Sequence, residues 1–377
     1  MTRSRAAKLL VSAVAIAAAV IFFNGRQGDL PQPQTVGTPD TADLPVGQSF
    51  VSDLHSIFTS STSHDSACDQ DNVSRGQSQV DWAEETARIR HDAVPVLAAS
   101  KDAEHKLAAA LLAYGEMNAA GAVDLLVEAG QLDPSNPMIA ARMLQMCQIA
   151  QEGCTLRLAD LEIQSLTTDR GNADTWARVA TSRAGRSDYA GALDALQEAA
   201  AAPEFSEYHV DTILLFDRAL AASAELSSVE RLRAAYSFAT VTPLTQNEMS
   251  GPCLEQARES GEWLNACLRW GERQELESKS TSGRLHGLVL QQTMYRLSGD
   301  AREEASAQAR QKEVAEESQK QIEAVSAVDW SRHEPILRNY LDMYAATDEF
   351  AAMDYLQAEM AWFPEEEATI PSSCSDP

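Results

Sequence analysis

The six cysteines are the residues whose type and spacing most directly predict chemistry in this chain. Cys147 and Cys154 are seven residues apart. One continuous helix would separate their Cα atoms by about 10.5 Å, whereas a disulfide needs less than roughly 7 Å. A bridge therefore requires a turn, which Gly153 can supply. Cys253 and Cys267 flank a second candidate turn at residues 259–262, so the sequence predicts two short-range disulfides in an oxidising compartment.

The other two cysteines, Cys68 and Cys374, are left over by elimination. If they pair, the N-terminal part of the chain is tied to its tail. If they do not, each is available to bridge to another protein. A redox-active pair is disfavoured because the sequence has no C-x-x-C. A zinc site is disfavoured as well, since no Cys or His cluster has ligand spacing, and we expect neither metal nor cofactor.

Catalytic residues cannot be identified from spacing. There is no H-E-x-x-H, G-x-S-x-G, phosphate-binding loop or dinucleotide fingerprint in the sequence. His286 is expected to be a packed or surface histidine, and acidic residues are too many for one catalytic pair to be singled out. We therefore expect no enzymatic activity, with a helical cell-envelope enzyme, for example a cell-wall hydrolase, as the alternative. The histidines are scattered: His55, His64, His91, His105, His209, His286 and His333.

Composition and charge narrow the class of protein. The formal net charge is -26, which argues against nucleic acid as a partner, because phosphate binding depends on clustered Lys and Arg. A basic protein partner is compatible with this charge. Hydrophobic residues make up 44% of the chain and aromatic residues only 6%, with Ala and Leu dominant. This composition favours close-packed helices over sheets and predicts an all-α fold.

The N-terminus predicts export. Arg3, Arg5 and Lys8 precede an apolar run at residues 9–23, so residues 1–24 are a signal anchor or a signal peptide. Fifteen residues of helix span about 22 Å, less than the roughly 30 Å hydrocarbon core, which favours cleavage. The bulky residues at the end of the run disfavour a clean cleavage site. We expect an uncleaved single-pass anchor in the bacterial inner membrane with a periplasmic body, and a secreted or soluble periplasmic protein after cleavage as the alternative.

The rest of the chain divides into three regions. Residues 25–79 are a Pro/Ser-rich linker with little to bury. Residues 80–204 show the apolar spacing of consecutive helical hairpins, with a kink or break expected at Pro95. Residues 205–377 continue the helical pattern, include a capping box formed by Ser227 and Glu230, and end in a closing hairpin and cap.

Residues 172–203 form the most complete of these hairpins and carry a family resemblance. Trp176, Val179 and Ala180 share one face of a first helix, and Ala192, Leu196 and Ala199 recur on a second. This spacing resembles the tetratricopeptide repeat (TPR), with Pro203 one residue early and Arg183 where Tyr is usual. The resemblance implies a TPR-like α-solenoid whose concave face binds other proteins. It also implies a groove lined by first-helix residues, here Thr175, Arg178, Thr181 and Ser182.

These observations predict an exported, membrane-tethered protein-interaction scaffold of the cell envelope. Its partners are expected to be proteins, with a basic surface as one possibility.

Overall fold

The computed structural model describes residues 70–114, 119–150, 154, 156–241, 249–326 and 334–361. Within these ranges the regular elements are all α-helices, which confirms the predicted class. In chain order the helices are α3 (Gln70–Ala98), α4 (Ala103–Tyr114), α5 (Ala119–Leu132), α6 (Pro137–Ala150), α7 (Leu158–Asp169), α8 (Ala173–Gly185), α9 (Tyr189–Ala201), α10 (His209–Ser223), α11 (Ser228–Val241), α12 (Ser250–Gln256), α13 (Gly261–Glu277), α14 (Thr281–Ser298), α15 (Ala301–Ser326), α16 (Glu334–Ala346) and α17 (Glu349–Ala361).

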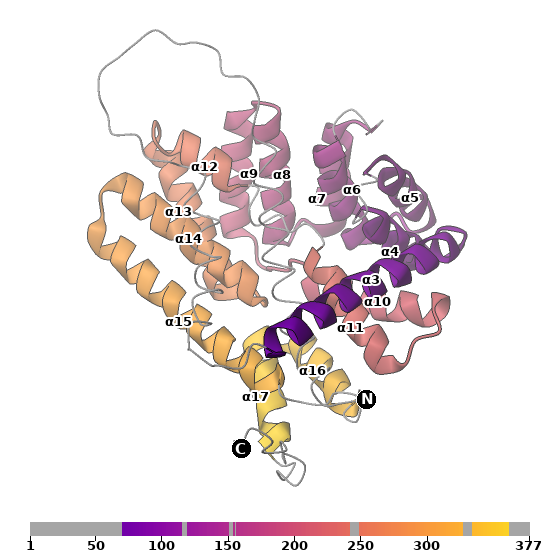
Figure 1. Ribbon diagram of the computed structural model, residues 1–377. Helices are drawn as coiled ribbons and strands as arrows, with labels where there is room; N and C mark the ends of the chain where they lie inside the picture. Colours follow the sequence, from indigo (N-terminus) through magenta and orange to yellow (C-terminus); the bar gives the residue numbers. More distant parts are fainter. Residues whose placement is uncertain are drawn as a thin grey trace, which may run out of the picture.

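Most helices pack against their neighbour in sequence as hairpins, among them α4 with α5, α8 with α9, and α13 with α14 (Figure 1). The seams of these hairpins are built from small and aliphatic side chains. In α8 and α9, for example, Ala180, Leu196 and Ala199 are fully buried. Small residues at such positions let two helix backbones approach closely, as the alanine-rich composition predicts.

The hairpin of α8 and α9 is capped at both of its starts. The Asn172 side chain accepts a hydrogen bond from the Asp174 backbone N–H at 3.0 Å at the start of α8. The Asp188 side chain accepts one from the Gly191 N–H at 3.0 Å at the start of α9. These bonds satisfy backbone donors that the first turn of each helix leaves without an intrahelical partner.

The chain does not continue as a simple row of hairpins. Helix α10 packs against α3, α4 and α16, and α13 packs against α9 rather than against α11 (Figure 1). In a regular solenoid each repeat contacts only the repeats beside it. Here α10 joins the first described helices to the last ones, so its N-terminal end is surrounded by parts of the chain that are distant in sequence.

Two glycines let α13 and α14 approach each other closely. A Cβ atom added to Gly287 in α14 would lie 2.5 Å from the Gly271 carbonyl oxygen in α13. A Cβ atom added to Gly271 would lie 2.9 Å from the Gly287 carbonyl oxygen. Because real Cβ atoms do not come this close to backbone atoms, the α13–α14 packing depends on glycine at both positions.

The helix cap at Ser227, the closing hairpin and the helix that contains Pro95 were all expected from the sequence. The capping box is confirmed: the Ser227 N–H donates to the Glu230 carboxylate at 3.0 Å and the Glu230 N–H donates to the Ser227 hydroxyl at 3.3 Å. The closing hairpin is present as α16 and α17. The helix α3 runs through Pro95 to Ala98, so the chain does not break there, and α3 begins at Gln70 inside the region predicted as linker.

The expected single-pass anchoring in the inner membrane is contradicted. Among the residues that the structure describes, no helix combines the length and the apolar character that crossing a membrane requires. The two longest helices, α3 and α15, carry acidic, basic and amide side chains along their length. The apolar run at residues 9–23, on which the expectation was based, lies outside the described residues, as does most of the predicted linker.

Candidate functional site

Both predicted short-range disulfides are present. Cys147 in α6 is bonded to Cys154, just before α7, with a Cα–Cα distance of 5.1 Å. Cys253 in α12 is bonded to Cys267 in α13, with a Cα–Cα distance of 5.9 Å. The second bond joins α12 to α13, on either side of the turn expected at residues 259–262. Gly153, which was expected to supply the turn for the first bond, lies outside the described residues. Cys68 and Cys374 lie outside the described residues.

The four predicted partner-binding residues belong to α8, but three of them are buried. Thr175, Arg178 and Ser182 are each 1% exposed, and Thr181 is partly exposed. The Arg178 guanidinium donates to Asp174 at 2.7 Å in its own helix and to Gln145 in α6 at 3.0 Å. The three buried side chains are therefore enclosed in the molecule, where the Arg178 guanidinium ties α8 to α6, and only Thr181 is partly accessible.

Two of the three hydroxyl residues of this set act in the same way, whereas Thr181 donates to the Ala177 carbonyl of its own helix at 3.0 Å. The Ser182 hydroxyl donates to Glu162 in α7 at 2.6 Å. The Thr175 hydroxyl donates to Asp169, the last residue of α7, at 2.8 Å. The polar face of α8 is thus used to dock α7, because buried hydroxyls need hydrogen-bond partners.

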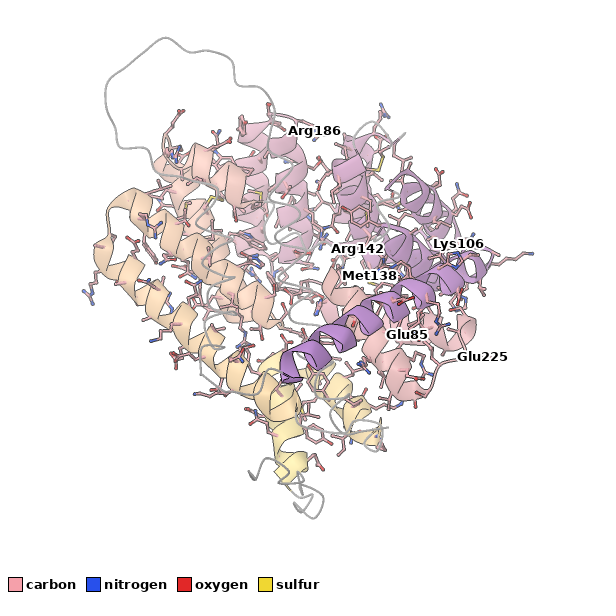
Figure 2. The ribbon with its side chains drawn as sticks, viewed as in Figure 1. Glu85, Lys106, Met138, Arg142, Arg186 and Glu225 are labelled. Atoms are coloured by element: carbon pink, nitrogen blue, oxygen red, sulfur yellow. A yellow bond between two sulfur atoms is a disulfide. The ribbon has the colours of Figure 1, made fainter. Side chains whose placement is uncertain are left out.

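A buried arginine continues this polar interior towards α10. Arg142 in α6 is 0% exposed, and its guanidinium donates to Gln145 at 2.9 Å and to the Thr212 hydroxyl in α10 at 3.3 Å. Figure 2 shows Arg142 and Met138 near the middle of the molecule, whereas Arg186 lies towards one edge. Burying a charged group at this depth is costly, and these two hydrogen bonds offset part of that cost.

The segment between α9 and α10 reaches the same interior because it pairs with the start of α8. The Ala173 N–H donates to the Glu204 carbonyl at 2.8 Å, and the Glu204 N–H donates to the Gly171 carbonyl at 3.1 Å. Tyr208, the residue before α10, has the left-handed φ of 55° and donates its hydroxyl to Asp169. This local geometry fixes the side chains on either side of Tyr208.

Those side chains line a pocket of about 60 Å³. Its walls come from the α9–α10 segment and the start of α10, from the α13–α14 connection, and from the end of α16. The polar side chains that matter for its chemistry are Glu207, Tyr208, His209, Asp211, Lys279 and Tyr344.

Glu207 is the buried acid of this pocket, with 4% exposure. The Ser280 backbone N–H donates to its carboxylate at 2.9 Å, and so does the Ser278 hydroxyl at 2.9 Å. Burial raises the pKa of Glu207 to about 7 against the lowering effect of the two serines, and the nearby Asp174 carboxylate raises it further. A carboxyl group with such a pKa changes charge near neutral pH.

His209 and Tyr344 contribute buried polar atoms to the same pocket. His209 is 7% exposed and Tyr344 is 0% exposed. Among the described residues, neither the His209 Nδ1 atom nor the Tyr344 hydroxyl has a hydrogen-bond partner. Burial lowers the pKa of His209, because the charged imidazolium would be poorly solvated, and it holds the pKa of Tyr344 well above its usual value.

A second feature lies on the outer faces of α5 and α9. Residues 121–129 and 191–199 share the pattern Gly-Ala-x-Asp-x-Leu-x-Glu-Ala, seventy positions apart. The shared Ala and Leu side chains are fully buried in both helices. The shared acidic residues are exposed in both: Asp124 and Glu128 in α5, and Asp194 and Glu198 in α9.

Neither feature was predicted from the sequence. Glu207 is one of many acids, and only its tertiary surroundings distinguish it. The acidic pairs differ, because each belongs to the shared pattern at residues 121–129 and 191–199. The apolar positions of that pattern pack both helices into hairpins, and the pattern is visible in the sequence. Comparison with known proteins adds no assignment: no family model, curated protein or solved structure matches the chain.

Proposed function

We propose that this protein is an exported interaction scaffold that binds a basic protein partner through the acidic outer faces of α9 and α5. The observation that carries the proposal is the repeated pair of exposed acids, Asp194 with Glu198 and Asp124 with Glu128, at matching positions of two hairpins. Residues four apart lie on the same side of a helix, so Asp194 and Glu198 form a local negative surface. In α5 the Lys106 ammonium donates to Glu128 and offsets part of the negative charge, so α9 presents the stronger acidic face.

The acidic pair of α9 is unfavourable for the free protein. Like charges four residues apart destabilise a helix by about 0.2–0.5 kcal/mol, and the α9 sequence has no Lys or Arg to offset them. Glu198 also lies in the last turn, where the helix dipole disfavours a negative charge. The Arg273 guanidinium in α13 donates to the Ala199 carbonyl at 3.3 Å and to the Ala200 carbonyl at 3.2 Å, and so offsets part of this second penalty. A partner that presents Lys or Arg to this face would reduce what remains of both penalties.

Ion pairs use acidic and basic side chains together, so the excess of acids over bases in the sequence remains as uncompensated negative charge. Arg178 pairs with Asp174, Arg231 pairs with Asp217, and Glu162 accepts from both Arg183 and Arg186. With a net charge of -26, the protein should attract a basic partner over distances set by the ionic strength.

Two further observations support an exported binding module. Two disulfides in one chain are typical of an oxidising compartment such as the periplasm or the outside of the cell. The TPR-like spacing of the α8–α9 hairpin is typical of proteins that bind other proteins. The binding face proposed here is the outer helix of each hairpin, since the polar face of α8 is covered.

An enzyme is the second candidate, and it rests on Glu207 alone. A carboxyl group with a pKa of about 7 in a pocket is suited to general acid–base catalysis. The pocket of about 60 Å³ is small beside the roughly 300–1,000 Å³ of sites for drug-sized ligands, which favours binding over catalysis. Hydrolysis of purified cell wall that is abolished in Glu207→Gln would reverse this preference.

The proposal is tested by cross-linking the full chain in its native envelope and identifying co-purified proteins. Wild type should capture a stoichiometric partner with a basic surface, and raising the salt concentration should weaken the complex steeply. Asp194→Lys with Glu198→Lys should lose the partner. The charge-matched control is Glu313→Lys with Glu316→Lys on α15, both exposed, and it should retain the partner. Equal capture by both double variants, or indifference to salt, would count against the proposed face.

A further inference from the structure

The pocket at the start of α10 has a distinct charge pattern. Glu207 and Asp211 place two carboxyl groups in its lining, whereas Lys279 is the basic residue there. The Lys279 ammonium donates to the Ala345 carbonyl at 2.6 Å, in the last turn of α16. The last carbonyls of a helix have no intrahelical donor and form the negative end of its dipole. The positive charge of Lys279 is therefore already engaged by the end of α16.

The pocket also contains hydrogen-bonding capacity that the described residues do not use. The Tyr344 hydroxyl and the His209 Nδ1 atom are both buried and without a partner among those residues. A neutral imidazole has one acceptor nitrogen, and a phenol oxygen can accept as well as donate. Since burial disfavours the charged imidazolium, His209 can serve as an acceptor in the free protein.

We propose that this pocket binds a primary ammonium group. An ammonium carries three N–H donors, which can bond the phenol oxygen of Tyr344, the acceptor nitrogen of His209 and a pocket carboxylate. An anion would meet Asp211 and the field of a protein with a net charge of -26, and an apolar group would leave the buried polar atoms without partners.

The size of the pocket limits what enters it. A volume of about 60 Å³ admits a few small atoms, such as the terminal carbon and nitrogen of an amine. The ammonium can therefore come from a free small amine or from the end of a Lys side chain. Only the second source rests on the proposed function, because it requires a basic protein partner.

The test uses the full-length oxidised protein with ¹³C-labelled His and Tyr rings, observed by NMR. Methylammonium chloride and Nα-acetyl-lysine methylamide are titrated separately, with potassium chloride at equal ionic strength and the Nε-acetylated lysine derivative as controls. Tyr344→Phe keeps the ring and removes the hydroxyl. Tyr355→Phe is the matched control, because Tyr355 belongs to the same closing hairpin and its hydroxyl bonds to Asn339.

We expect saturable shifts of the His209 and Tyr344 signals with an ammonium probe and none with the controls. Tyr344→Phe should weaken binding at least threefold, and Tyr355→Phe should not change it. Stronger binding of the lysine derivative identifies a Lys side chain as the ligand, whereas equal or stronger binding of methylammonium identifies a free amine. Shifts of the same size with potassium chloride, or with the Nε-acetylated lysine derivative, would overturn the proposal. Failure of the ammonium proposal does not contradict the proposed binding face on α9, because that face is tested separately by partner capture.

Discussion

Asn172 and Ser206 hold each other through two hydrogen bonds that run in opposite directions. The Ser206 backbone N–H donates to the Asn172 side-chain oxygen at 2.9 Å, and the Asn172 side-chain nitrogen donates to the Ser206 carbonyl at 2.9 Å. The same side-chain oxygen caps α8. One buried amide therefore fixes both the start of α8 and the segment that carries Glu207 and His209.

Replacing the Asn172 side chain should lower the free energy of unfolding. Asn172→Ala leaves the Ser206 and Asp174 backbone groups without their partners in a buried site, and Asn172 is 1% exposed. Each such loss costs about 1–3 kcal/mol, so we expect a destabilisation of roughly 2–4 kcal/mol. Urea unfolding with the disulfides intact measures it, with the exposed Asn265→Ala in α13 as the control. A change below about 0.5 kcal/mol would show that the segment is held by other contacts.

Because of Glu207, the free energy of unfolding should fall as the pH rises, whereas most acids in folded proteins have the opposite effect. Its pKa is raised from 4.5 to about 7 in the folded protein, so the folded state binds more protons than the unfolded state. Its contribution is most favourable below pH 4.5 and is lost as the pH rises through 7. Relative to Glu207→Gln, wild type should lose roughly 3 kcal/mol between pH 4 and pH 8.

Unfolding curves for the two proteins across this pH range provide the comparison. His286 acts in the opposite direction: burial lowers its pKa to about 4, so its contribution is lost as the pH falls from 6.5. For this reason the comparison uses the difference in free energy of unfolding between wild type and Glu207→Gln at each pH. The pH profile of either protein alone would mix the two effects. Glu204→Gln, at an exposed neighbouring position, is the control and should follow wild type. A constant difference between wild type and Glu207→Gln would contradict the assignment.

The contact between α13 and α14 supplies the third prediction. In Gly287→Ala the new Cβ atom would meet the Gly271 carbonyl oxygen at 2.5 Å and the Glu275 N atom at 2.6 Å, both backbone atoms that cannot move aside alone. We expect the helices to separate and the protein to lose about 1–3 kcal/mol. Gly261→Ala, at the start of α13, adds a Cβ atom with no neighbour within 4 Å and should be neutral or slightly stabilising. Thermal unfolding of both variants shows whether the loss of stability comes from the close helix contact at Gly287 or from replacing any helical glycine.

The parts predicted from the sequence are those set by local chemistry. The apolar spacing around Trp176 identified the α8–α9 hairpin, Ser227 with Glu230 identified a cap, and the cysteine spacing identified two disulfides. The surroundings of Arg178 could not be predicted in the same way. Helical periodicity separates an apolar face from a polar one, but it does not show that α6 and α7 cover the polar face of α8.

The candidate pocket could not be predicted for a related reason. Glu207 and Tyr344 are far apart in sequence and come together only because α10 packs against the C-terminal hairpin. Neither residue stands out by type or spacing. The acidic pairs differ from them, because their positions are fixed by the same repeat that buries Leu126 and Leu196.

These pairs lead to a prediction in which stability and binding move in opposite directions. Glu198→Lys replaces a like-charge pair with an Asp194–Lys pair four residues apart and puts a positive charge in the last turn of α9. Because Arg273 already donates to the Ala199 carbonyl at this end of α9, we expect the free protein to gain about 0.2–0.5 kcal/mol and partner capture to fall. Gln197→Lys, also exposed and in the same turn, adds a positive charge without removing the acid, so it should keep more of the partner. Denaturant unfolding and co-purification, measured on the same three proteins, separate the two effects. If Glu198→Lys stabilised the protein and retained its partner fully, the acidic face of α9 would be a solvated surface and not a binding site.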